Sequence, residues 1–172
     1  METKIVQPWM KGLIISLITI TYSIALYLTG QWQNKSLGYI SYAVVMGGII
    51  WSCIYYANQM EGKVSFGNIF AHGFKVTATL IVVTVLYTVL SVKVIFPEMT
   101  DKILEITAKE LEKNPQLSES DAKKALEFTG KFMMPFMIGA TIFGYGIFGA
   151  ISSAIGAGVA KKNPQATPFD QQ

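Results

Sequence analysis

The chain has 172 residues, of which 51% are hydrophobic and 15% are charged, and its mean hydropathy is +0.40. A typical soluble domain has about 25% charged residues, and here the shortage is uneven, because residues 93–131 hold 15 of the 25 charged side chains. This pattern excludes an ordinary soluble domain and a disordered chain, and it indicates an integral membrane protein. The net charge of +3 includes no Arg. Because proteins that read phosphates and base edges depend on the Arg fork, we expect no nucleic-acid partner.

Four uncharged runs are long enough to cross a bilayer core, which takes about 20 apolar residues in a helix. They predict helices at about 12–30, 37–57, 69–96 and 132–160. The first run exceeds the apolar region of a secretory signal and no A-x-A cleavage site follows it, so we expect an uncleaved helix. The predicted fold class is all-α, a polytopic membrane protein with four transmembrane helices in a single membrane domain over residues 1–172.

A polar stripe precedes the third predicted helix. After the turn at residues 61–63, Ser65 is a candidate N-cap. Asn68, His72 and Lys75 then fall at i, i+4 and i+7, on one helical face. One interpretation is a solvated face on an interfacial helix or on an extension of the third helix. The other is a polar site at the membrane surface, with His72 as its titratable group.

The charged segment between the third and fourth predicted helices has helical signals of its own. Apolar residues recur at helical spacing between Glu98 and Lys113, and a second helix opens at Ser118, where Asp121 completes a capping-box arrangement. We therefore expect an extracytoplasmic helical hairpin insertion over residues 98–131, whose second arm runs into the fourth helix. Its charges alternate in sign, which is typical of a solvated face rather than a metal site. Residues 161–172 are expected to form a flexible tail.

The fourth predicted helix concentrates small residues at the spacing that lets membrane helices approach closely. The candidate packing positions form two adjacent rows and are Gly146, Gly149, Ala150, Ser153, Ala154, Ala157 and Gly158. Their partner is either another helix of the same chain, with the second helix offering small residues of its own, or a second copy of the chain.

The distribution of Lys predicts how the chain is threaded. One side of the membrane collects the Lys residues of both termini and of the second loop. The other side has Lys35 and the segment 93–131, whose seven Lys are offset by eight acidic residues. We therefore expect a multi-pass protein with both termini in the cytoplasm.

The sequence lacks the usual patterns of catalysis. There is no H-E-x-x-H, G-x-S-x-G, P-loop or C-x-x-C motif, and one His and one Cys cannot build a conventional triad together with a metal site. We expect no enzyme and no cofactor. The favoured function is a non-enzymatic interaction or structural module in the lipid bilayer, which contacts a second copy or another membrane protein through helix four or the outer hairpin. The alternative is a small transporter or channel subunit that works as an oligomer.

Three stretches carry a family resemblance: G-L-I-I-S-L at residues 12–17, V-S-F-G-N-I-F-A-H-G-F at residues 64–74, and the Ile-Phe-Pro at residues 95–97. With them the chain resembles a family of small four-helix bacterial membrane proteins classed as a domain of unknown function. The resemblance implies a location in the bacterial inner (cytoplasmic) membrane and implies no reaction.

Overall fold

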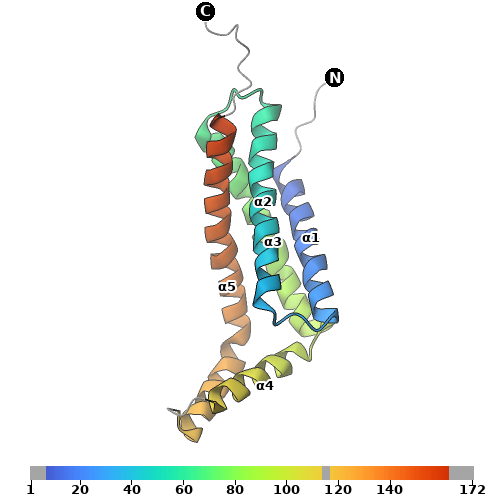
Figure 1. The fold of residues 1–172 in the computed structure, drawn as a ribbon, viewed down its shortest axis with the longest axis vertical. Coiled ribbons are helices and arrows are strands. Elements are labelled where there is room, and N and C mark those ends of the chain that lie inside the picture. Colours follow the sequence, from blue (N-terminus) through green and yellow to red (C-terminus); the bar gives the residue numbers. More distant parts are fainter. Residues whose placement is uncertain (1–6, 114–116, 163–172) are drawn as a thin grey trace, which may run out of the picture. The chain divides into compact units, whose positions relative to one another are not determined.

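The computed structural model describes residues 7–113 and 117–162, in which every regular element is helical. The elements, drawn in Figure 1, are α1 (Pro8–Leu28), α2 (Lys35–Gln59), α3 (Phe66–Leu90), a π-helix (Ser91–Ile95) that continues α3, α4 (Met99–Glu112) and α5 (Glu119–Lys162). The all-α class is confirmed. Four of these helices are long and apolar enough to cross a membrane: α1, α2, α3 with its π-helical end, and α5.

Several helix bounds differ from the sequence expectation. The first helix begins at Pro8, because proline is well suited to a first helical turn, so Lys11 lies inside α1 rather than before it. The stretch that contains His72 is part of α3 itself, which begins at Phe66. The predicted tail at 161–172 lies outside the described residues from 163 onward, and α5 ends at Lys162.

The chain divides into two compact units, and α3 and α5 each contribute to both. We call residues 1–84 with 143–172 the bundle unit and residues 85–142 the α4 unit. The bundle unit contains α1, α2, most of α3 and the second part of α5. The α4 unit contains the end of α3, the π-helix, α4 and the first part of α5.

Glycines let the helices of the bundle unit approach one another. A Cβ atom at Gly12 of α1 would lie 2.7 Å from the Cβ of Thr79 in α3, and a Cβ atom at Gly48 of α2 would lie 2.8 Å from Ile15 in α1. At Gly73 of α3 the added atom would meet side chains of α2 and α5 at once, each at 2.6 Å. Contacts this short leave no room for a side chain, so packing through small residues defines how these helices fit together.

The interior of the bundle unit is unusually rich in polar groups. Its buried polar side chains are Lys11, Ser16, Thr19, Ser52, His72, Thr77, Ser152 and Ser153. Most of the hydroxyls donate to the carbonyl four residues earlier in the same helix, as Ser16 does to Gly12 at 2.7 Å and Ser153 to Gly149 at 2.7 Å. These groups are therefore satisfied within their own helices, as is common for Ser and Thr in apolar surroundings.

The helix ends in the bundle unit have standard capping features. Gly30 and Gly62 have φ angles of 71° and 72°, the left-handed conformation that commonly follows a helix end. The side chain of Asn34 accepts a hydrogen bond from the amide of Ser36 at the start of α2. The expected cap at Ser65 is present, because its hydroxyl accepts from the amide of Asn68 at 3.2 Å.

In the α4 unit, α4 is strongly amphipathic and lies against the first part of α5. Leu104 of α4 lies 3.7 Å from the position that a Cβ atom at Gly130 would occupy. At the start of α5 the hydroxyl of Ser118 accepts from the amide of Asp121 and donates to its carboxylate, so the expected cap is confirmed. A single helix then continues through Pro135 to Lys162.

The exposed pair of Glu105 and Lys109 gives α4 a defined response to pH. A hydrogen bond of 2.6 Å from the Lys109 ammonium lowers the pKa of Glu105 below its ordinary value. Because the folded pKa is the lower one, the pair stabilises α4 above the ordinary carboxylate pKa, and the contribution is lost as the pH falls through the folded value. We expect Lys109→Met to return the pKa of Glu105 to its ordinary value, as measured by carboxyl ¹³C NMR. Lys102→Met, which removes a separate pair with Glu98, is the control and should leave the Glu105 titration unchanged.

Candidate functional site

The three residues of the predicted polar stripe line a single pocket. Asn68, His72 and Lys75 of α3 meet side chains from the start of α1 and the end of α2 around a half-open cavity of 250 Å³. The remaining lining residues are Gln7, Pro8, Tyr56 and Ala71. The pocket belongs entirely to the bundle unit. We call it the α1–α3 pocket.

His72 is buried rather than solvated, with only 6% of its surface exposed. Its Nε2 lies 3.1 Å from the hydroxyl of Ser52, and its ring stacks on Tyr56 with the centroids 4.3 Å apart and the planes 7° apart. Neighbouring Gly73 lets α3 approach α2 and α5 closely at this level. The imidazole is thus held between two side chains of α2, and it lines the pocket from a fixed position.

Lys11 is the most unusual group near this site, because only 3% of it is exposed. Its ammonium nitrogen lies 3.4 Å from the carbonyl oxygen of Ser52, 4.2 Å from the ring centre of Tyr55 and 5.6 Å from that of Trp51. Ring faces attract a cation through their quadrupole, most strongly where water is excluded. Carbonyl and ring contacts therefore stabilise this charge in place of a carboxylate.

The electrostatic balance at the α1–α3 pocket is positive. Among the described residues of the bundle unit, Glu61 is the single acidic residue, and its carboxylate pairs with Lys63 at 3.1 Å. No ion pair joins Lys11 or Lys75 to a carboxylate within the described part of the chain.

The predicted packing residues of α5 lie on two different faces. Gly149, Ser153 and Ala157 are buried, and a Cβ atom at Gly149 would overlap the side chain of Thr77 in α3. The other row is more accessible, and a Cβ atom at Gly146 or Gly158 would meet nothing within 4 Å; this row consists of Gly146, Ala150, Ala154 and Gly158. The first row contacts helices of the same chain.

Cys53 lies at the centre of this packing. It is fully buried, and its sulfur is 3.7 Å from the carbonyl oxygen of Ile69, which accepts its weak hydrogen bond. A thiol without access to solvent does not react. We expect a membrane-permeant maleimide to label Cys53 only after the bundle unit opens. Labelling of the native protein in detergent should be at least about 10-fold slower than labelling in denaturant; equal rates would contradict this packing.

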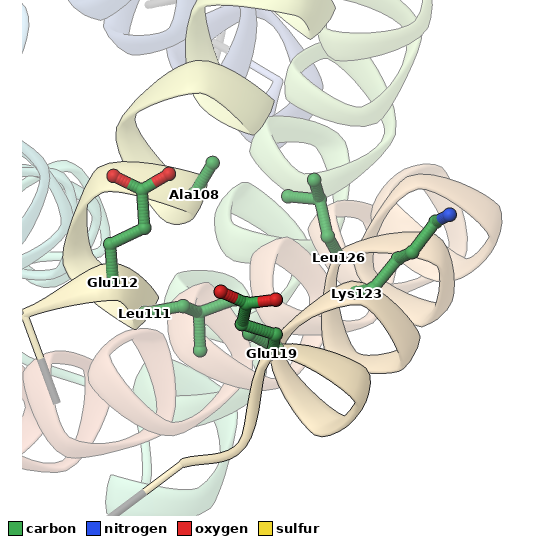
Figure 2. Close-up of a pocket in the computed structure, with 7 residues that line it drawn as sticks. Ala108, Leu111, Glu112, Glu119, Lys123 and Leu126 are labelled. Carbon is green, nitrogen blue, oxygen red and sulfur yellow. The ribbon is translucent and has the colours of Figure 1, made fainter. Parts of the chain in front are cut away.

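The α4 unit has two grooves between α4 and the first part of α5. One, of 420 Å³, is lined by Ala108, Leu111, Glu112, Glu119, Ala122, Lys123 and Leu126. Figure 2 shows that Lys123 directs its ammonium group away from the carboxylates of Glu112 and Glu119. The other groove, of 390 Å³, is apolar and is lined by Ile103, Phe128, Thr129, Phe132, Met133, Phe136 and Met137.

No cluster of three or more His, Cys, Asp or Glu side chains able to hold a metal ion occurs in residues 7–113 and 117–162. The chemistry available at the α1–α3 pocket is that of amide, imidazole, phenol and ammonium groups. All four can donate hydrogen bonds.

Comparison with known proteins assigns a family but no activity. The model of the DUF4199 family, described as a protein of unknown function, matches residues 11–162. The chain belongs to this family. The DUF4199 match covers α1 from Lys11 onward and the other four α-helices. No curated protein and no solved structure gives a significant match.

Proposed function

We propose that this DUF4199 chain is a four-span integral membrane protein of the bacterial cytoplasmic membrane that acts by binding rather than by catalysis. The observation that carries the membrane assignment is the distribution of side chains in the bundle unit, where large apolar side chains are exposed and polar side chains are buried, the reverse of a soluble protein. In α1, Ile14, Leu17 and Ile18 are more than half exposed, whereas Lys11 and Ser16 are buried. The same exposure of large apolar side chains continues along α2, α3 and α5.

Such a surface favours lipid over water. Soluble monomers rarely expose contiguous apolar patches beyond a few hundred Å², whereas lipid accepts them at no cost. A helical backbone also meets the bilayer's demand that its polar groups be satisfied internally. The length of each candidate span, from 21 residues in α1 upward, suffices to cross the bilayer core.

The proposed orientation places both termini in the cytoplasm. The Lys residues at the start of α1, in the loop before α3 and at the end of α5 all fall on one side if each candidate span crosses once. Residues 98–131 then form an extracytoplasmic helical hairpin, with the grooves of the α4 unit available to another membrane protein or a second copy. These assignments follow from charge and connectivity.

Binding is favoured over transport by the packing of the bundle unit. The helices meet through glycines, and most of the buried hydroxyls bond within their own helices, which leaves few groups to line a polar path. The pocket and grooves instead open at the surface. We therefore propose a non-enzymatic interaction module.

One observation favours the second candidate, a small transporter or channel subunit that works as an oligomer. Lys11 and His72 are ionisable, buried and within candidate spans, and such residues commonly mark ion or substrate paths. Liposome reconstitution separates the two functions. An integral membrane protein of either function remains in the membrane pellet after alkaline carbonate washing. A binding module then moves no ion or small solute across the liposome membrane. Solute flux that Gly149→Leu abolishes would overturn the binding proposal, and Gly146→Leu serves as the control.

A further inference from the structure

We propose that the α1–α3 pocket binds an anionic phosphate group. This inference deepens the proposed binding function and rests on it for the position of the pocket at the membrane surface. The chemistry is shared by two sources, the headgroup of an anionic phospholipid and a soluble phosphate.

The pocket presents donors from three helices or their flanks toward one space. Lys75 supplies an ammonium, Asn68 and Gln7 supply amides, Tyr56 a phenol and His72 an imidazole ring. Phosphate oxygens accept several hydrogen bonds at once, and bonds in which both partners are charged are the strongest of these. The cavity of 250 Å³ is large enough for a phosphate together with part of the group that carries it.

His72 makes this a formed site rather than a patch of surface lysines. Its ring is held by the stack on Tyr56 and the contact with Ser52, so it lines the pocket without freedom to turn away. Ser52 also fixes Lys11, whose ammonium lies 3.4 Å from the carbonyl oxygen of that residue. His72 and Lys11 are therefore held in place before any ligand arrives, which lowers the entropic cost of binding.

The charge around the pocket selects an anion. Among the described residues no acidic side chain lines it, and the single described carboxylate of the bundle unit is already paired with Lys63. Lys11, which forms no ion pair with a carboxylate of the described residues, adds a positive charge from within the bundle. A cationic ligand would find no carboxylate among the described lining residues to pair with.

The proposed position in the membrane would bring the pocket close to the phosphate groups of lipids. If α1 and α3 both span the bilayer, the pocket lies where they start, at the level of the lipid headgroups. Basic pockets between transmembrane helices on the cytoplasmic side commonly hold lipid phosphates. Phosphatidylglycerol carries an unneutralised phosphate, whereas the phosphate of phosphatidylcholine is neutralised by its own choline.

The test uses the full chain in two arms. In the first, the protein is extracted from vesicles of equal phosphatidylglycerol and phosphatidylcholine, and native mass spectrometry measures the ratio of lipids retained. In the second, thermal melting in detergent compares inorganic phosphate with chloride at equal ionic strength. Lys75→Met and Asn68→Ala alter exposed pocket residues, so the fold should survive. Lys63→Met changes a lysine outside the pocket and is the matched control.

Retention of phosphatidylglycerol that falls about 10-fold in Lys75→Met, but not in Lys63→Met, supports a lipid phosphate. Stabilisation by inorganic phosphate with the same dependence on Lys75 supports a soluble one. The proposal is overturned if neither arm responds in folded protein, or if Lys63→Met acts as strongly as Lys75→Met. Loss of the protein from carbonate-washed membranes would instead refute the membrane assignment, while the phosphate arm still tests the pocket.

Discussion

Gly149→Ala should destabilise the bundle unit by about 1–3 kcal/mol, the range for overpacking a tight interior. The added Cβ would overlap the side chain of Thr77, including its Cβ at 2.8 Å, an atom fixed to the backbone of α3 that cannot rotate away. The helices would have to separate to admit it. Reversible unfolding in mixed detergent micelles, followed by far-UV circular dichroism, measures the change.

Gly146→Ala is the matched control in the same helix. A Cβ at Gly146 would meet nothing within 4 Å, so only the gain in helix propensity remains. That gain is about 1 kcal/mol in favour of alanine. The two substitutions should therefore have opposite signs although they lie three residues apart. Equal effects at both positions would show that α5 does not pack against α3 through Gly149.

Lys11→Glu should have the second large effect, a loss of about 3–5 kcal/mol in the free energy of unfolding, comparable to leaving an uncompensated charge buried. The carboxylate would replace the ammonium beside the carbonyl oxygen of Ser52 and the faces of Tyr55 and Trp51. The carbonyl oxygen and both ring faces carry partial negative charge, so each favourable contact would become repulsive. The same micelle unfolding assay provides the measurement.

Lys11→Met separates the effect of reversing the charge on stability from the effect of losing the packing of the lysine stem. Methionine has nearly the length of the lysine stem and buries no charge. Because well-packed apolar residues often replace buried ions without loss, we expect this variant to fold as stably as the original or more so. A loss in Lys11→Met as large as that in Lys11→Glu would contradict the assignment and would mean that the ammonium itself is needed for folding.

The sequence predicted the long helices because uncharged runs of this length have few alternatives. It also predicted the cap at Ser118, where a short side chain and an acid three residues later have a direct mechanism. The start of α1 was harder to predict from the sequence. Lys11 reads as a flanking charge in the sequence, and only the contacts with Ser52 and Tyr55 show that it is buried.

The candidate site was predictable in part. Helical spacing alone brought Asn68, His72 and Lys75 to one face, and these three residues do line one pocket. The contributions of Tyr56 and Gln7 come from other helices or their flanks, at sequence separations that a periodic pattern cannot reveal. The burial of His72 was equally hidden, because it depends on how closely Gly73 lets α2 and α5 approach.

Single-cysteine accessibility measures directly whether the chain has four spans with cytoplasmic termini. On a Cys53→Ser background, cysteine is placed at Gln33, Ser65 or Ser120, all exposed positions outside the apolar stretches. A membrane-impermeant thiol reagent is then applied to intact cells with a single membrane or to spheroplasts. We expect labelling at 33 and 120 but at 65 only after lysis. Labelling at 65 alone would indicate the opposite orientation, with both termini outside the cytoplasm. Labelling at all three positions would contradict membrane insertion with this topology.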